Sequence, residues 1–279
     1  MKVLVLGTSS GAGKTTFCAM LCNHFGREGH RVTPFKASNL SLNSFATEDG
    51  GEIGMGQAFQ AWSADIEPSV DMNPILMKPT GNGNIQLIVN GKPLRDVNKE
   101  NPVNRDEAME HVMSAMERLS EKYDVIICEG SGSPVELNIM DRDLANTGLM
   151  KKTGVPAILV GDIEGGGCFA AIYGTWLLMP EDIRHNMRGF VINRFRGDPD
   201  ILKPAIDRIC ELTGMKYLGI LPYVKLRFPE EDSLSFSEGK MSGDDALTAF
   251  RNNISELTDI AESNGFDFDE LEKIMKSSA

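Results

Sequence analysis

Cysteine, positive charge and long apolar runs are all scarce in this chain of 279 residues. The five cysteines are an odd number with no CxxC pair, so we expect buried thiols in a reducing cytoplasm rather than disulfides or a metal site. The 28 Lys and Arg are outnumbered by 40 Asp and Glu, for a net charge of −12. Nucleic acid is therefore not an expected partner. An anionic ligand must be held by local positive groups.

No segment approaches the run of about 18 apolar residues that a membrane-spanning helix needs. The N-terminus leads at once into the apolar stretch KVLVL, so we expect no signal peptide and no membrane partner. The composition, 41% hydrophobic and 24% charged, is ordinary for a globular domain. We expect a cytoplasmic protein with one large α/β domain.

Short apolar segments alternate with helical patterns along most of the chain. Strands are expected at Lys2–Leu6, Arg31–Phe35, Val125–Cys128, Ala157–Val160, Phe190–Ile192 and Gly219–Leu221. Because these segments are apolar throughout, each is expected to be buried on both faces. The predicted fold class is α/β, with a doubly wound, mostly parallel sheet and helices on both faces. Ligands of such folds bind at the carboxyl ends of the strands.

Two segments depart from this alternation. The stretch Thr80–Leu94 predicts an extended excursion with Gly-Asn turns. Near the C-terminus, apolar residues spaced by three and four from Leu247 to Ala261 predict an amphipathic helix, and Asp269–Met275 predicts a last short one. We therefore divide the chain into a main domain, residues 1–239, and an acidic helical appendage, residues 240–279.

The stretch GTSSGAGKTT, residues 7–16, has the pattern and the place of a phosphate loop, between a strand and a helix. Glycines let successive backbone N–H groups face one anion, and the helix N-terminus adds a partial positive charge. Lys14 is expected to reach the terminal phosphates and the Thr15 hydroxyl to bind Mg²⁺. This predicts a P-loop NTPase whose ATP-binding residues are Gly11, Ala12, Gly13, Lys14, Thr15 and Thr16.

Three further positions are expected beside the nucleotide. Glu129 ends the third strand of the predicted sheet, where a carboxylate can hold Mg²⁺ directly or through water. Asn193, at the end of a later strand, can read a base edge through its amide, and Pro222 in GILPY can wall the base. For each position, the alternative interpretation is a solvated or packed residue at a strand end.

Several blocks together resemble the ATP-dependent amidotransferase domain of the cobyric acid synthase family. They are KASNLSLNSF, DGGEIGMGQAFQA, EPSVDMNPILMKPT, VNGK, EGSGSPVELNIMDRDLAN, INRFRGD and PEEDSL. The resemblance runs from residue 3 to about 235 and places the chain in the wider dethiobiotin synthetase-like P-loop superfamily. It implies that ATP phosphorylates a carboxylate of a corrinoid or similar polycarboxylate, and that ammonia then displaces phosphate.

The resemblance also implies roles for individual residues. Lys36 would hold the reacting carboxylate, with Lys14 and Asp143 as further catalytic residues, and Glu52 would join Thr15 and Glu129 as a metal ligand. The substrate would be lined by Ser38, Asn39, Ser41, Asn43, Ser133, Asp141 and Asn146. The alternatives are a polar capping loop around Lys36 and a salt-bridged helix start around Arg142.

Two departures from the family pattern affect these expectations. No GxCxG elbow of a glutaminase is found, so ammonia is expected from solution or from a separate glutaminase subunit, and Cys168 is interpreted as a core residue. Gly165 stands where the family has arginine, which leaves the identity of the substrate open. The relatives also imply a homodimer.

Two other functions remain open on the sequence. The chain can be a P-loop ATPase that acts as a nucleotide switch or delivers a cofactor to a partner. It can also be a carboxylate-activating ligase of the dethiobiotin synthetase type that makes no amide. The blocks KASNLSLNSF and DRDLAN favour a ligase, because a switch needs only the nucleotide residues.

Overall fold

The computed structural model describes residues 1–224 and 244–277, with side chains omitted for 244–246. The PEEDSL block and the expected boundary at residue 239 lie outside this range. The chain divides into two packed units. The first unit comprises Met1–Phe17, Glu129–Lys225 and Glu256–Ala279, and the second comprises Cys18–Cys128 and Leu226–Ser255. No helix in the described ranges is long and apolar enough to cross a membrane.

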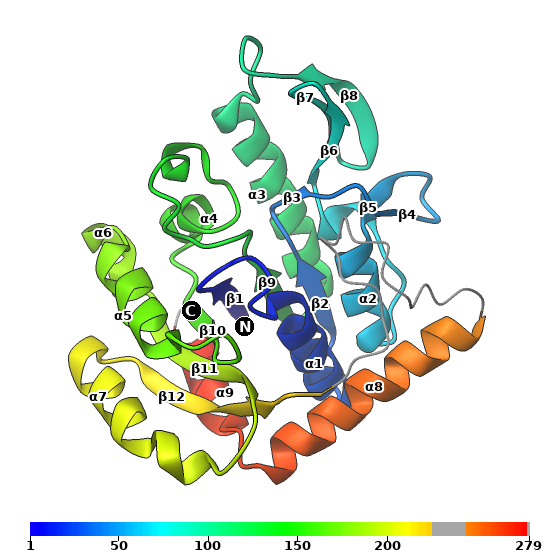
Figure 1. Cartoon of the computed structure of the whole chain (residues 1–279). Coiled ribbons are helices and arrows are strands. Elements are labelled where there is room, and N and C mark those ends of the chain that lie inside the picture. Colours follow the sequence, from blue (N-terminus) through cyan, green and yellow to red (C-terminus); the bar gives the residue numbers. More distant parts are fainter. Residues whose placement is uncertain (225–243, 278–279) are drawn as a thin grey trace. The chain divides into compact units, whose positions relative to one another are not determined.

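The first unit is built on four parallel strands in the order β12-β11-β10-β1. Their bounds are β1 Lys2–Gly7, β10 Ala157–Asp162, β11 Met187–Phe195 and β12 Lys216–Pro222. Its helices are α4 Thr147–Thr153, α5 Cys168–Leu178, α6 Glu181–Arg184, α7 Lys203–Thr213 and α9 Phe268–Lys276, with short 3-10 turns at Met140–Arg142 and Pro199–Leu202. Helices α5 and α7 lie side by side (Figure 1).

Helices cover both faces of these four strands. Gly161 of β10 faces α5, since a Cβ there would lie 2.8 Å from Ile172. Gly161 is in register with Ile192, and Ile192 with Ile220, so these three positions share a face. The preceding residue of β12, Gly219, points to the opposite face, where a Cβ would lie 3.0 Å from Phe266, two residues before α9 begins. The predicted α/β fold with a mostly parallel sheet is confirmed.

The second unit pairs β2 (Val32–Phe35) with β9 (Val125–Glu129) in parallel. It also holds a sheet in the order β3-β6-β7-β8, formed by Ser38–Leu40, Ile75–Gly81, Asn84–Val89 and Lys92–Val97, and a hairpin of β4 (Ser44–Ala46) and β5 (Glu52–Gly54). The expected excursion is thus a β-meander. Asn82–Gly83 and Asn90–Gly91 turn with positive φ, as tight hairpins require.

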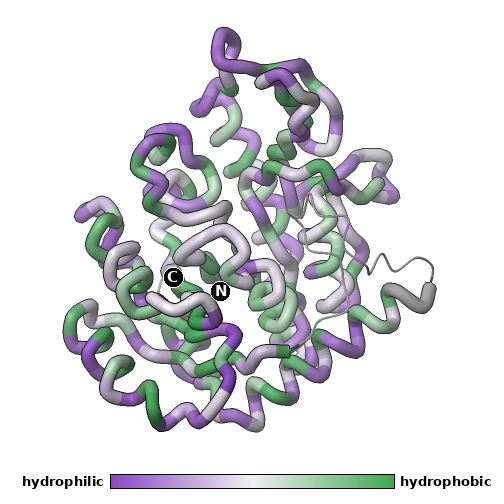
Figure 2. The backbone as a smooth tube through the Cα atoms, in the orientation of Figure 1, coloured by the Kyte–Doolittle hydropathy of each residue, from purple (hydrophilic) through white to green (hydrophobic). Residues whose placement is uncertain are grey.

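Three long helices belong wholly or mainly to the second unit, α1 (Lys14–Arg27), α3 (Arg105–Lys122) and α8 (Asp244–Ser263), besides the shorter α2 (Met55–Ser63) and a 3-10 turn at Val70–Met72. Asn104 caps α3, accepting hydrogen bonds from the N–H groups of Asp106 and Glu107. The predicted amphipathic helix is confirmed in α8, along which hydrophilic and hydrophobic positions alternate (Figure 2). Its Phe250 and Ile254 are buried with Ala19 of α1.

Candidate functional site

The phosphate loop connects β1 to α1 in the first unit, and its glycines are required by its geometry. Gly11 and Gly13 have φ of +73° and +98°, which residues with a Cβ rarely adopt. A Cβ on Gly7 would lie 3.0 Å from the Lys14 side chain, and one on Gly13 would lie 2.1 Å from the Asn193 amide nitrogen. The loop is therefore closely packed by the two side chains that the sequence assigned to the nucleotide.

Lys14 is buried, with only 7% of its surface exposed, and its ammonium group donates to backbone carbonyls. Nζ lies 3.0 Å from the Ser9 carbonyl oxygen and 2.9 Å from that of Gly132. Gly132 belongs to the loop after β9, so Lys14 connects two loops at the carboxyl edge of the sheet. An ammonium held there by neutral carbonyls can still neutralise an anion placed over the loop.

Thr15 and Glu129 lie side by side, as the sequence predicted for a metal site. The Thr15 hydroxyl donates to Glu129 Oε1 over 2.7 Å, and Glu129 is buried with 1% exposed. Two hard oxygen ligands suit Mg²⁺, which takes its other ligands from phosphates and water. In the described ranges, His, Cys, Asp and Glu form no group of three or more that could hold a metal by itself. The residues present therefore fit a metal bound together with a nucleotide.

Asn193 reaches back from the end of β11 to the phosphate loop. Its Nδ2 donates to the Ala12 carbonyl over 2.9 Å, and its Oδ1 accepts from the Arg194 N–H. Asn193 thus fixes the loop conformation in addition to any contact with a base. Pro222 ends β12 and is followed by Tyr223. The Arg196 guanidinium lies 3.6 Å from the centre of the Tyr223 ring. Arg196 also forms an ion pair with Glu164 over 2.6 Å.

The DRDLAN block forms the entry to α4 and supports the loop after β9. The Asp143 carboxylate accepts from the N–H groups of residues 145, 146 and 148, from the Thr147 hydroxyl and from the Asn146 amide. Asn146 in turn accepts from the Ser131 N–H and donates to the Ser131 carbonyl. Asp141 is exposed on a 3-10 turn, and Ser133 is half-buried. This network replaces the alternative of a salt-bridged helix start at Arg142, for which no ion pair is found among the described residues.

The substrate residues predicted in KASNLSLNSF belong to the second unit. The segment is not one loop, because Ser38–Leu40 forms β3 and pairs in parallel with β6. Lys36, Ser38, Asn39 and Ser41 are buried, whereas Asn43 is exposed. The sequence interpretation missed Asn73, which is fully buried and donates to the carbonyls of Lys36 and Ile75. The available signal in the sequence was an asparagine within the block EPSVDMNPILMKPT.

Glu52, the third predicted metal ligand, also lies in the second unit and has other partners there. Its Oε2 accepts from Lys78 Nζ over 2.5 Å and from the Ser44 hydroxyl over 2.8 Å. Burial alone would raise the pKa of Glu52, but the hydrogen bonds from Lys78 and Ser44 hold it below its usual value. Lys78 was not predicted. Its position in the same block, EPSVDMNPILMKPT, was the available signal in the sequence.

Cys168 is a core residue, as predicted. It is 2% exposed at the start of α5, and burial raises the pKa of its thiol to about 12. A thiol with that pKa is protonated near neutrality and is not a nucleophile. The five cysteines, all in the part of the chain that the structure describes, form no disulfide, and four of them are buried.

The nucleotide-binding geometry agrees with a comparison against protein families. Residues 3–234 match the model of the CobQ/CobB/MinD/ParA nucleotide binding domain. The chain belongs to this family. The match covers the phosphate loop, the loop after β9 and the end of β11, and the family is one of nucleotide-binding domains.

The curated relatives of this family member are named probable cobyric acid synthase. The protein of Methanosarcina acetivorans is 48% identical over 237 residues, which cover 85% of this chain and 49% of the relative. That of Methanococcoides burtonii is 46% identical over 275 residues, covering 98% of this chain and 55% of the relative. The chain thus spans about half the length of the curated relatives it matches.

Two of the solved structures that resemble this family member do so at low sequence identity. The signal recognition particle receptor FtsY of Elizabethkingia anophelis is 14% identical, with a TM-score of 0.47, over 91% of this chain and 64% of that one. The MinC:MinD complex of Aquifex aeolicus is 15% identical, with a TM-score of 0.45, over 92% of this chain and 96% of that one. Neither likeness bears on function.

Proposed function

We propose that this chain uses ATP to activate a carboxylate of a polycarboxylic substrate as an acyl phosphate, which ammonia then converts to an amide. The observation that carries the proposal is the juxtaposition of Lys14, Thr15 and Glu129 in a nucleotide-binding family whose curated relatives are named cobyric acid synthase. The proposed substrate class is a corrinoid or another tetrapyrrole-type polycarboxylate.

The first unit would bind and orient ATP. The backbone N–H groups of the glycine-rich loop would hold the phosphates, and Lys14 would neutralise negative charge on the terminal phosphoryl group. Thr15 and Glu129 would hold Mg²⁺, which when bound draws charge from the phosphate oxygens. Asn193 would keep the loop in its binding conformation through the Ala12 carbonyl.

Lys36 is the proposed carboxylate-binding group. Its backbone is fixed on both sides, because its N–H donates to the Met72 carbonyl and its own carbonyl accepts from Asn73. A buried ammonium at a strand end can hold a carboxylate and then stabilise the negative charge that develops on it. The neighbouring Ser38 and Asn39 would contribute polar contacts to the substrate.

In the proposed mechanism, Asp143 is a positioning residue. Its carboxylate already accepts hydrogen bonds from four successive residues, 145–148, which leaves little capacity to accept a proton from ammonia. Its contribution would be to fix Asn146 and, through it, the loop whose Gly132 carbonyl contacts Lys14. Glu52 would need to release or share Lys78 in order to bind a metal.

The test is an incubation of the purified chain with ATP, Mg²⁺, ammonium and a panel of corrinoid, sirohydrochlorin-type and simple polycarboxylic acids. Phosphate release and product mass are followed together. The expected result is that one acid raises ATP turnover and gains an amide. ATP turnover that leaves the acid as an acyl phosphate and forms no amide would indicate a carboxylate-activating ligase of the dethiobiotin synthetase type instead.

The Lys36→Ala variant separates a ligase from a nucleotide switch. We expect it to bind a fluorescent ATP analogue as the parent does and to lose acid-stimulated turnover by at least about a hundredfold, as removal of a charge-stabilising group typically does. Lys203→Ala, on the exposed start of α7, is the matched control and should change neither measurement. Normal turnover in Lys36→Ala would refute the ligase assignment and favour an ATPase that acts on a partner.

A further inference from the structure

The segment KASNLSLNSF of the second unit has an inverted pattern of burial. Its polar side chains Ser38, Asn39 and Ser41 are buried, whereas Leu40 and Leu42 are exposed to 48% and 56%. Single exposed apolar residues are common in folded proteins, but a segment that buries its polar groups and exposes its leucines is informative. No role proposed above for ATP or substrate uses the two leucines.

Internal hydrogen bonds hold this inversion in place. Asn39 Nδ2 donates to Gln57 Oε1 over 3.3 Å. The Ser41 hydroxyl donates to the Asn43 carbonyl and accepts from the Asn43 N–H, each over 3.1 Å. Because successive side chains of a strand point to opposite faces, Leu40 points away from the side on which Asn39 and Ser41 find these partners. The exposure of Leu40 is therefore fixed by the fold.

Leu40 belongs to a small apolar surface at one edge of a sheet. Its strand β3 is an edge strand of the sheet β3-β6-β7-β8, and Leu40 is in register with the half-buried Met77 of β6. Paired residues of adjacent strands share a face, so Met77 extends the surface, and its flexible side chain adapts to what contacts it. A stable protein–protein interface uses about 20–30 residues on each side, so these few side chains suit a small molecule.

Lys36, the proposed carboxylate-binding group, lies at the start of the same segment. An extended chain spans at most about 3.6 Å per residue, so the Cα atoms of Lys36 and Leu40 lie within about 14 Å of each other. Both ends of this stretch are fixed, because the Lys36 N–H donates to the Met72 carbonyl and the Ser41 N–H to the Met77 carbonyl. A ligand that contacts both Lys36 and the leucines must combine a carboxylate with an apolar body.

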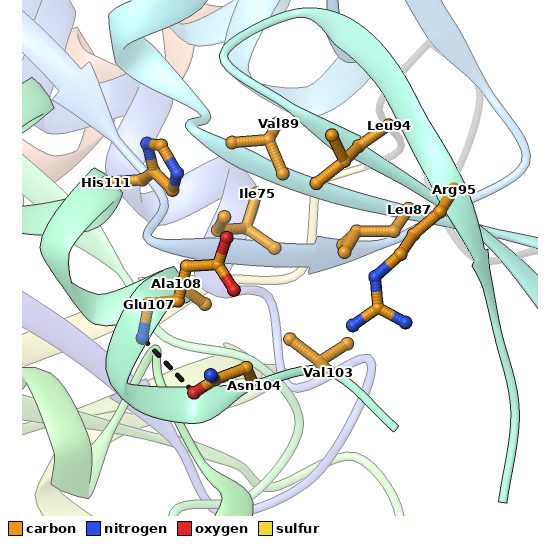
Figure 3. A pocket seen from close by; sticks show the side chains of 10 residues that line it. All are labelled: Ile75, Leu87, Val89, Leu94, Arg95, Val103, Asn104, Glu107, Ala108 and His111. Atoms are coloured by element: carbon orange, nitrogen blue, oxygen red, sulfur yellow. Dashed lines mark hydrogen bonds between the residues drawn. The ribbon is translucent and has the colours of Figure 1, made fainter. Parts of the chain in front are cut away.

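The hollow beside the start of α3 is not an alternative site for such a ligand. It lies between Leu87 and Val89 of β7 and the first turn of α3 (Figure 3). Its volume of about 20 Å³ admits about one water molecule. It therefore cannot hold the apolar body of a polycarboxylic substrate.

We propose that Leu40, Leu42 and Met77 bind the apolar body of the substrate whose carboxylate Lys36 holds. The inference rests on the proposed function and deepens it, because it selects one class among the polycarboxylic acids. A corrinoid or other tetrapyrrole-type acid carries carboxylates around an apolar ring and would contact both parts of the segment. An open-chain polycarboxylate would contact Lys36 and leave the leucines in water. The three apolar side chains are thus specificity-determining and take no part in the chemical step.

Binding measured without ATP tests this assignment independently of catalysis. The full chain is titrated with uroporphyrin I, a ring-bearing polycarboxylate followed by its fluorescence, and with tricarballylate, an open-chain one followed by calorimetry. We expect uroporphyrin I to bind at least about tenfold more tightly than tricarballylate. The variant Leu40→Thr/Leu42→Thr should bind uroporphyrin I at least about tenfold more weakly than the parent does, equivalent to about 1.4 kcal/mol. Its thermal unfolding and its affinity for a fluorescent ATP analogue should not change.

Leu94→Thr is the matched control. Leu94 is exposed to 57% on β8, the opposite edge strand of the same sheet (Figure 3). Threonine suits strands, so the substitutions should leave the sheet intact, and Leu94→Thr should bind uroporphyrin I as the parent does. Three results would overturn the proposal: no binding of uroporphyrin I by the parent, unchanged binding in Leu40→Thr/Leu42→Thr, or an equal loss in Leu94→Thr.

Turnover of the same variants separates this inference from the proposed amidation. We expect Leu40→Thr/Leu42→Thr to raise the KM for the amidated acid at least about tenfold with kcat unchanged, as loss of uniform binding does. An acid that is amidated by this variant with the parent KM would refute the role of the leucines and leave the amidation standing. If no acid stimulates ATP turnover but binding of uroporphyrin I depends on the leucines, the amidation is refuted and the binding surface stands.

Discussion

Replacing Gly13 by alanine tests the tightest contact of the nucleotide site. Two costs add. A residue with a Cβ at φ +98° loses about 1–2 kcal/mol relative to glycine. The new Cβ would also lie 2.1 Å from Asn193 Nδ2, so the amide must move away from the Ala12 carbonyl. Loss of that buried hydrogen bond costs about 1–3 kcal/mol. We therefore expect Gly13→Ala to lose about 2–5 kcal/mol of unfolding free energy.

Gly11→Ala is the matched control, because it carries the first cost without the second. Gly11 has φ +73°, but a Cβ there would meet no atom within 4 Å. We expect it to lose only about 1–2 kcal/mol. Urea unfolding of both variants, with titration of a fluorescent ATP analogue, measures the difference in stability and in nucleotide affinity.

The double variant Gly13→Ala/Asn193→Ala separates the clash from the backbone cost. Once the Asn193 amide is absent, Gly13→Ala should cost no more than Gly11→Ala does. The two substitutions should then be non-additive by at least about 1 kcal/mol, as is common for residues in contact. Equal losses in Gly13→Ala and Gly11→Ala, or strict additivity in the double variant, would show that Asn193 does not pack against the loop in solution.

Three further outcomes are expected. Iodoacetamide at pH 8 should alkylate Cys168 about a thousandfold more slowly than an ordinary thiol, because a pKa of about 12 leaves little thiolate; labelling at the ordinary rate, followed by mass spectrometry, would contradict its burial. Asn146→Ala should lower the unfolding free energy by about 1–3 kcal/mol, since the Ser131 N–H loses its acceptor; an unchanged urea midpoint would exclude that role. Lys78→Met should destabilise the chain more at pH 7 than at pH 3. The depressed pKa of Glu52 makes the pair contribute stability above the usual Glu pKa of about 4.3, and this contribution is lost as the pH falls through the folded value. Equal effects of Lys78→Met at both pH values would argue against the pair.

Periodicity and glycine placement made the first unit largely predictable. Strands such as KVLVL are apolar throughout because both faces are covered, and the phosphate loop has a fixed spacing dictated by its backbone conformation. The pairing of Thr15 with Glu129 followed from their places at the ends of adjacent elements. The strands and the phosphate loop depend on local sequence alone, whereas the Thr15–Glu129 contact joins segments 114 residues apart.

The second unit was less predictable, because its polar residues are organised by contacts between distant segments. Nothing local to Lys36 indicates that Asn73 fixes its carbonyl, or that the strand after it pairs with β6. Glu52 was assigned to a metal from family spacing, whereas Lys78, 26 residues later, is its partner in the structure.

The two glycines that face opposite sides of the central strands have a consequence for ligand binding. Because Gly161 and Gly219 have no side chains, Ile172 on one face and Phe266 on the other rest directly on the backbone. Because side chains pack against these strands on both faces, the strands cannot shift along their length without displacing those side chains. The edge that carries Asn193 is therefore ordered before any ligand arrives. On the proposed function, a nucleotide that binds there would lose less free energy to ordering of the protein, and more of its contact energy would appear as affinity.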